Sequence, residues 1–109
     1  MARRRRGNAN ALTTIYWRDI PAQITASADG ATAKVMLEPR FQHAIDRAAA
    51  VADLTETEAY VAQWRKVNTP LDGDPQTTAD EAAATLAAAY PRERLEQLVA
   101  QGGAEATDG

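Results

Sequence analysis

Few residues of this 109-residue chain are of the types that carry out chemistry, and they stand apart from one another. The chain has no cysteine, which excludes a disulfide, a thiolate nucleophile and a cysteine-ligated metal. The one histidine, His43, falls opposite the apolar side of the helix expected around it, beside Asp46 and Arg47. We expect it to be a solvated surface residue, because a single histidine lacks the partners that catalysis or metal binding needs.

Asp19 is the carboxylate placed closest to other functional groups, since Tyr16, Trp17 and Arg18 directly precede it. An Arg–Asp pair beside aromatic rings can shift the pKa of the carboxyl group, but such pairs are more often structural than catalytic. The chain also lacks a glycine-rich phosphate loop, an HExxH motif and a Ser, His, Asp order. We therefore predict a protein that is not an enzyme and has no cofactor.

The same stretch is well suited to recognition. On a strand, Ile15 and Trp17 would share one face, and Tyr16 and Arg18 the other, where ring and guanidinium can stack. Aromatic and arginine side chains are also the commonest hot spots of protein interfaces. The predicted partner-binding residues are Tyr16, Arg18, Asp19, Trp64 and Arg65, with the wet face of the hairpin described below as a second candidate surface.

The positive charge is concentrated at one end of the chain, in Arg3, Arg4, Arg5 and Arg6. Without these four, eight of the twelve cations remain against fifteen acidic residues, so the body carries a net charge of −7. An acidic body argues against a nucleic-acid-binding face on the domain itself. We expect residues 1–10 to be a disordered basic tail, with electrostatic contact to nucleic acid, an acidic lipid or an acidic protein as the alternative.

Nothing in the chain predicts a segment that crosses a membrane. No apolar run approaches the length of a span. An export signal would need an apolar segment after the arginines, where residues 7–10 instead read GNAN. We therefore expect a cytoplasmic protein.

The strand signals lie in the first third of the chain. Residues 12–17 are rich in β-branched and aromatic side chains, and Pro21 should interrupt the ladder that follows. Residues 22–37 predict a hairpin that turns at Asp29-Gly30. Pairing Ala28 with Ala31 puts apolar residues opposite one another on one face, and leaves a polar face of Gln23, Thr25, Ser27, Thr32, Lys34 and Met36.

Helix signals follow. Pro39 is suited to a first helical position, and the stripe Phe41, Ala44, Ile45, Ala48 and Ala52 should lie on the apolar face of the hairpin. The capping box Thr55-x-x-Glu58 predicts a second helix, with Tyr60, Val61, Trp64 and Val67 on its buried face.

The remaining chain is expected to lie outside the core. A stretch dense in turn residues indicates a linker over 69–77, and Thr78-x-x-Glu81 a cap for an alanine-rich helical extension over 78–102, before a disordered tail over 103–109. The predicted core domain spans 11–68. Its fold is α+β, a three-stranded antiparallel meander with two helices packed on one face.

Three elements of the sequence resemble one family. They are residues 16–23, YWRDIPAQ, then Arg40-Phe41-Gln42, then Tyr60-x-x-x-Trp64-Arg65, and they cover about residues 12–67. In these the chain resembles the small bacterial virulence factor domain family. Members of that family are short proteins, or modules beside a NifU-type scaffold module and helical repeats. The resemblance implies an adaptor and no catalytic residue.

Two main interpretations of function follow. The first is a non-enzymatic adaptor that docks a protein partner through its aromatic and arginine surface. The second, implied by family gene neighbourhoods, is an accessory subunit of a corrinoid or tetrahydrofolate methyl-transfer system. Nucleic-acid binding through the run Arg3, Arg4, Arg5 and Arg6 is a third and weaker interpretation.

Overall fold

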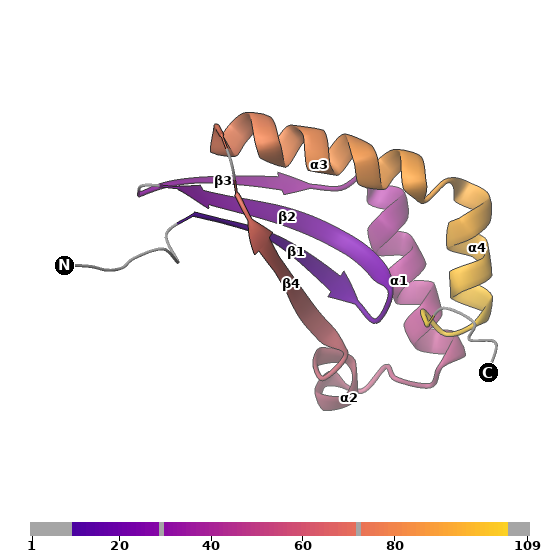
Figure 1. The fold of residues 1–109 in the computed structure, drawn as a ribbon. Helices are drawn as coiled ribbons and strands as arrows, with labels where there is room; N and C mark the ends of the chain where they lie inside the picture. Colours follow the sequence, from indigo (N-terminus) through magenta and orange to yellow (C-terminus); the bar gives the residue numbers. More distant parts are fainter. Residues whose placement is uncertain (1–9, 29, 72, 105–109) are drawn as a thin grey trace.

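A four-stranded antiparallel sheet forms the centre of the protein, with strand order β3-β2-β1-β4 (Figure 1). The computed structural model describes residues 10–28, 30–71 and 73–104. The expectations for the arginine run, for Asp29 and for most of the C-terminal tail lie outside these residues. The strands are β1 (Ala11–Trp17), β2 (Ile20–Ala28), β3 (Ala31–Met36) and β4 (Trp64–Pro70). The helices are α1 (Pro39–Val51), α2 (Thr57–Val61), α3 (Pro75–Ala89) and α4 (Arg92–Ala100).

The predicted hairpin is confirmed in its register. Ala28 pairs with Ala31, Ala26 with Ala33 and Ile24 with Val35, and the Leu37 amide donates to the carbonyl of Ala22. Gly30 adopts a φ of 86°, a left-handed conformation that glycine takes without a steric penalty. The hydrophobic alternation was enough to set this pairing, because a slip of one residue would expose every apolar side chain.

β1 and β2 are joined by a tight turn at Arg18 and Asp19, so Pro21 lies near the start of an internal strand. The ladder between them shifts at a β-bulge, where Ile15 pairs with Gln23 but Tyr16 pairs with Pro21. Proline lacks an amide donor, and bulges and strand starts are the places where a sheet tolerates it. The predicted interruption is therefore present as a bulge, and the chain stays in the sheet.

The second predicted helix is wrong beyond its first turn. α2 has only five residues and begins at Thr57 with Glu56 as its N-cap, so the expected capping box at Thr55 does not form. Trp64 and Val67 instead belong to β4, a fourth strand paired with β1. The i, i+3 spacing of these residues fits a helix, but Val, Asn, Thr and Pro over 67–70 are weak helix formers. Pairing with β4 also gives hydrogen-bond partners to the backbone amides and carbonyls along the edge of β1 that β2 leaves free.

The expected linker and extension also differ in the structure. Thr69 and Pro70 belong to β4, and α3 begins at Pro75, three residues before the expected cap. The N-cap is Asp74, whose carboxylate accepts a hydrogen bond of 2.8 Å from the Thr77 amide. Asp74 and Thr78 are both residues that can cap a helix, and the Thr78-x-x-Glu81 pattern favoured the second. Pro75 is suited to the first helical position, and this places the start of α3 directly after Asp74.

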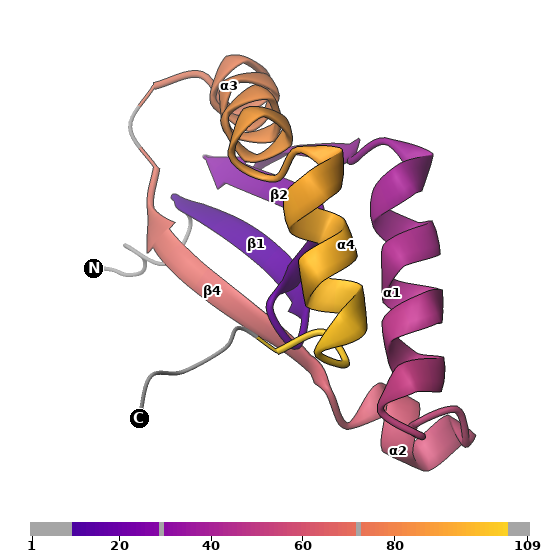
Figure 2. The ribbon, with the colours of Figure 1, turned by 90° about the vertical axis from the view of Figure 1, so that its right-hand side faces the viewer.

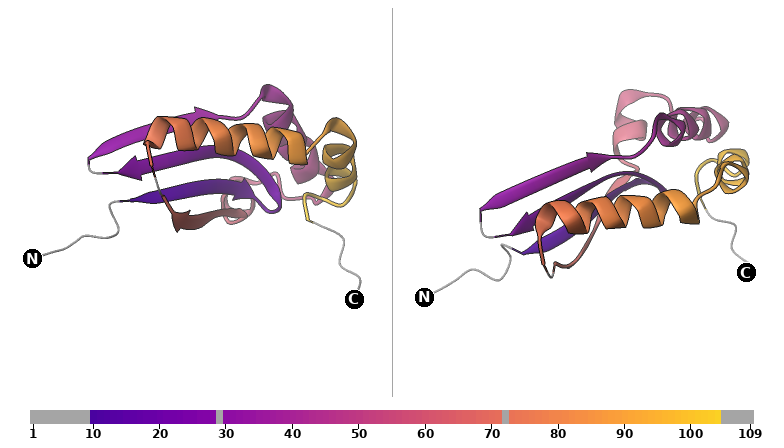
Figure 3. Two further views of the ribbon diagram at one scale, coloured as in Figure 1. Left: turned by 45° about the horizontal axis from the view of Figure 1, so that its top comes forward. Right: turned by 90° about the horizontal axis from the view of Figure 1, so that it is seen from above.

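α3 and α4 belong to the core rather than to an appendage. α3 covers the apolar face of the hairpin, where Ala79 packs with Ile24, Ala26 and Ala33 (Figure 3). This corrects the prediction that the helix at Pro39 would lie there. Alanine-rich helices can approach a sheet closely, so the low side-chain volume of α3 is what fits it to this face.

α1 and α4 lie side by side at one end of the sheet (Figure 2). Their buried residues, among them Phe41, Ile45 and Leu98, enclose Trp17 and Ile20 in a second cluster. Trp17 has no exposed surface, and its indole Nε1 donates a 2.9 Å hydrogen bond to the carbonyl of Tyr60 in α2. One tryptophan thus ties three helices to the end of β1.

Candidate partner-binding surface

Four of the five predicted residues lie close together at the β1–β2 turn. The Arg65 guanidinium lies over the Tyr16 ring, 4.5 Å from its centroid. Its Nε donates to the Arg18 carbonyl over 2.7 Å, and its Nη2 forms an ion pair of 3.0 Å with Asp19 Oδ1. Tyr16 and Arg65 are cross-strand partners, which places both on the same face of the sheet.

Arg18 is turned inward and is not an open recognition residue. Its φ of 55° redirects the side chain out of the alternation that the strand would impose. The guanidinium Nε donates to Gln63 Oε1 over 3.1 Å, and Nη1 donates to the Gly102 carbonyl over 3.0 Å. Arg18 therefore joins the start of β4 to the C-terminal turn. This function depends on residues that lie far away in sequence, so local patterning could not reveal it.

Trp64 is the fifth predicted residue, and it lies on the opposite face from Arg65 because the two are neighbours on β4. The Trp64 side chain is half-buried and meets the Tyr60 ring edge-on, with 5.9 Å between centroids. It lines a shallow hollow of about 420 Å³ together with Ile15, Ala22, Gln23, Met36 and Gln42. The predicted surface is therefore two surfaces, one on each side of the sheet.

The hollow opens onto the sheet face that α3 leaves uncovered, which we call the open face. It comprises the polar side of the hairpin and its continuation across β1 and β4. Thr13 Oγ1 in β1 donates a 2.7 Å hydrogen bond to Asn68 Oδ1 in β4, so these two side chains lie on the same face of the sheet. The open face consists of Thr13, Ile15, Gln23, Thr25, Ser27, Thr32, Lys34, Met36, Trp64, Lys66 and Asn68.

The charge of the sheet contrasts with that of the whole protein. None of the four strands contains an aspartate or a glutamate, whereas Lys34, Arg65 and Lys66 are all exposed. The complete chain carries a net charge of −3. The sheet is thus a positive surface on an acidic protein. Sequence analysis missed the contribution of Lys66, because this residue lies on the same face as Lys34 only once β4 joins the sheet; the two lysines stand on strands at its opposite edges.

β4 is the exposed edge strand of the sheet. It is last in the strand order, its one extensive neighbour is β1, and every residue from Arg65 to Pro70 is exposed. Across the same sheet, Met36 has 61% of its surface exposed beside the hollow. An edge strand offers unpaired backbone donors and acceptors to an added strand.

Two classes of site find no support in the described part of the chain. Over residues 10–28, 30–71 and 73–104, no group of three or more histidine, aspartate or glutamate side chains is placed to hold a metal ion. Within the same ranges, no helix is long and apolar enough to cross a membrane.

The fold and this surface define a small α+β protein in which one face of an antiparallel sheet is covered by a helix and the other is open. Residues 15–99 match the family model described as "Virulence factor", and the chain belongs to that family. The match extends beyond the residues 12–67 that carried the resemblance, and it includes α3 and most of α4. No match was found among curated proteins or among solved structures.

Proposed function

We propose that this protein is a non-enzymatic interaction module that binds a partner protein on the open face and at the free edge of β4. The observation that carries the proposal is the positive, acid-free sheet on an acidic chain, with an apolar hollow at Trp64. On the open face the exposed Lys34 and Lys66 are therefore not accompanied by a carboxylate from any of the four strands.

The occupant that this surface fits is an extended segment of a partner protein, rich in acidic residues and carrying one large apolar side chain. Such a segment can add to β4 through backbone hydrogen bonds, and alternate side chains then fall over the open face. Lys66, on β4 itself, provides the complementary charge beside the added strand, whereas Lys34 lies on the far edge strand of the same face. The hollow lined by Ile15, Met36 and Trp64 receives the apolar side chain.

The same features disfavour pairing with a second copy of this chain. Two β4 strands that pair edge to edge about Arg65 and Lys66 would place these residues of one copy near those of the other, without intervening carboxylates from the strands. Like charges directly opposite one another in a sheet are destabilising. Pro70 limits any added strand to the positions before it.

The proposal is tested by affinity capture with three variants that each change the charge by one unit. Met36→Glu and Lys66→Ala alter the open face, whereas Thr85→Glu adds the same charge at an exposed site on α3. We expect the first two to lose a captured partner and the third to retain it. Deleting residues 3–6 should leave capture unchanged, because the proposed surface is made of residues on the sheet and does not depend on these arginines.

The captured partner is then purified and titrated into the isotope-labelled protein. The proposal predicts that amide resonances of β4 and the hollow shift, and that an acidic extended segment of the partner suffices to shift them. Equal loss of capture in Thr85→Glu, loss on tail deletion, shifts confined to the α3 side, or failure to capture any partner would each contradict it.

A further inference from the structure

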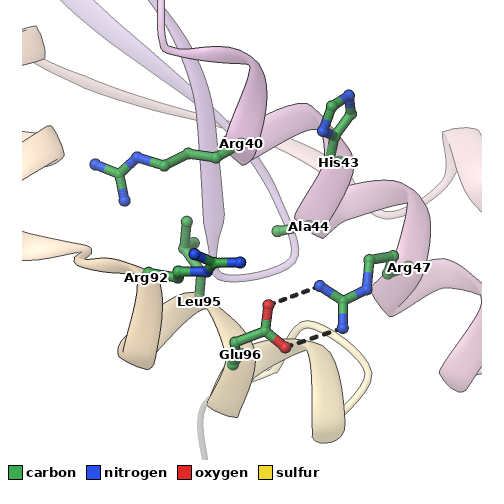
Figure 4. Close-up of a pocket in the computed structure, with 7 residues that line it drawn as sticks. All are labelled: Arg40, His43, Ala44, Arg47, Arg92, Leu95 and Glu96. Atoms are coloured by element: carbon green, nitrogen blue, oxygen red, sulfur yellow. Dashed lines mark hydrogen bonds and ion pairs between the residues drawn. The ribbon is translucent and has the colours of Figure 1, made fainter.

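A second concave site lies between α1 and α4, away from the open face. Its volume is about 260 Å³. Cationic side chains surround a small apolar floor formed by Ala44 and Leu95 (Figure 4). Arg40, His43 and Arg47 reach it from α1, and Arg92 and Glu96 from α4. We call this site the interhelical groove.

Two of the three arginines in the groove already have structural partners. The Arg47 guanidinium forms two hydrogen bonds with Glu96, of 2.7 and 2.9 Å, which join α1 to α4. This pairing lowers the pKa of the Glu96 carboxyl, so Glu96 is ionised at neutral pH. Arg40 forms an ion pair of 2.9 Å with Glu38, and it donates to the carbonyls of Tyr90 and Ala87 over 2.7 and 3.1 Å, at the end of α3.

Arg92 has no such partner. Within the described part of the chain it makes no hydrogen bond or close ion pair, although it lies near enough to Glu96 to contribute to lowering the pKa of that carboxyl. Figure 4 shows the Arg92 guanidinium in the space between the two helices, with Arg40 on one side and Arg47 on the other. The arrangement leaves an exposed cation at the mouth of a preformed hollow between the helices.

The charges of the groove sum to a positive value. Three arginines against one glutamate give the lining residues a net charge of +2 with His43 neutral, and counting Glu38, the ion-pair partner of Arg40, leaves +1, in a protein whose total is −3. Concentrating cations in this way costs repulsive energy unless an anion is present. Arginine forks match the oxygens of phosphate in geometry and number, and a phosphate group carries close to two negative charges at neutral pH.

We propose that the interhelical groove binds a phosphate group, either as the free ion or as the phosphoryl group of a small monoester. Arg92 provides the primary contact, with Arg40 and Arg47 as fixed cations on either side. Leu95 and Ala44 form a floor that excludes water from one side of the ligand, which strengthens each electrostatic contact.

The test is a titration of the isotope-labelled protein with inorganic phosphate, and separately with phenyl phosphate, at constant ionic strength. Saturable amide shifts at Ala44, Leu95 and their neighbours are expected. Arg92→Ala should weaken binding by about ten-fold or more, because it removes charge-assisted hydrogen bonds. Lys66→Ala removes one exposed positive charge from the open face and should leave the affinity unchanged.

The two ligands distinguish the source of the phosphate. Tighter binding of phenyl phosphate than of inorganic phosphate assigns the groove to a monoester, and the reverse assigns it to the free ion. Shifts that grow linearly without saturation, equal weakening in Lys66→Ala, or equal affinity for acetate at the same ionic strength would each overturn the proposal. Arg92 is exposed, so the loss of its side chain should not unfold the protein.

Discussion

At the scale of single residues, the turn after β1 is held by the C-terminal end of the chain. The Asp19 amide donates a 2.9 Å hydrogen bond to the carbonyl of Gly103, and Arg18 bonds to the carbonyl of Gly102. Both glycines are buried and have left-handed φ values, 73° for Gly102 and 92° for Gly103. A side chain at Gly103 would collide with the Trp17 ring, and one at Gly102 would press against Ala52, so both close approaches depend on glycine.

Gly103→Ala should therefore destabilise the protein strongly. A Cβ atom at this position would lie 2.9 Å from Trp17 Cζ3, in addition to the strain of its positive φ. We expect the free energy of unfolding to fall by about 3 kcal/mol from the two effects together. Urea denaturation monitored by tryptophan fluorescence measures this change.

Gly30→Ala is the matched control for that substitution. Gly30 has a similar φ of 86°, but a Cβ atom there would have nothing within 4 Å. Its cost should be limited to the backbone strain, about 1 kcal/mol. If the two variants were equally stable, the packing of Trp17 against the C-terminal turn would not contribute to stability as the structure indicates.

At the scale of elements, prediction from sequence succeeded where a pattern was local. The hairpin register followed from alternation around Gly30, and the start of α1 followed from Pro39. β4 was missed because Trp64 and Val67 have a helical spacing, and only pairing with a strand almost fifty residues earlier decides between the two. The position of α3 was missed for a related reason. Its alanines form no distinct apolar stripe in the sequence, and the face of the sheet that they contact is known only from the three-dimensional structure.

The candidate site was predicted in part for the same reason. Tyr16, Asp19 and Arg65 do come together, as their residue types indicated. Arg18 was assigned to the surface because regular alternation was assumed through a position whose φ is in fact positive. Met36 was already placed on the wet face of the hairpin, whereas the positions of Lys66 and Trp64 on that face, and with them the hollow, could not be found without the fourth strand.

The N-cap of α3 gives a prediction at this scale. A hydrogen bond from the Thr77 amide lowers the pKa of the Asp74 carboxyl below its ordinary value of 3.8. Because the folded pKa lies below the unfolded one, the carboxylate contributes stability above the unfolded pKa and loses it as the pH falls through the folded pKa. Asp74→Ala should thus lower the urea midpoint at neutral pH, and this deficit should shrink on acidification below 3.8.

Asp80→Ala provides the comparison, since Asp80 is also exposed on α3 but lies in its interior. Replacing it removes a side-chain bond from Gln76 and no cap, so its midpoint at neutral pH should be closer to that of the wild type. A deficit of Asp74→Ala that stayed constant from neutral to acidic pH would show that its carboxylate charge is not what stabilises the helix.

At the scale of the whole molecule, the two sides of the sheet have different surroundings because the helices divide unequally between them. α3 covers the apolar side of the hairpin, and α1 with α4 encloses the end at Trp17. The open face therefore stays available along β4 without exposing the main core. Separation of the interhelical groove from the open face also means that the two proposed ligands need not compete for the same surface.

This division predicts that the chain cannot fold without its last third, contrary to a core domain ending at residue 68. Truncation after Pro70 removes Leu95, Leu98 and Val99, which are buried against Trp17 and α1, and uncovers Ile24 and Ala26. Burial of each large apolar side chain is worth roughly 1.5–3 kcal/mol, so the loss approaches the whole stability of a typical domain, about 5–15 kcal/mol.

We expect collapsed amide dispersion in the NMR spectrum of the truncated chain and a loss of cooperative unfolding. Deletion of residues 105–109 serves as the control and should preserve both. A dispersed spectrum from residues 1–70 would instead show that the sheet, α1 and α2 are stable alone, and that α3 and α4 only cover a domain already formed.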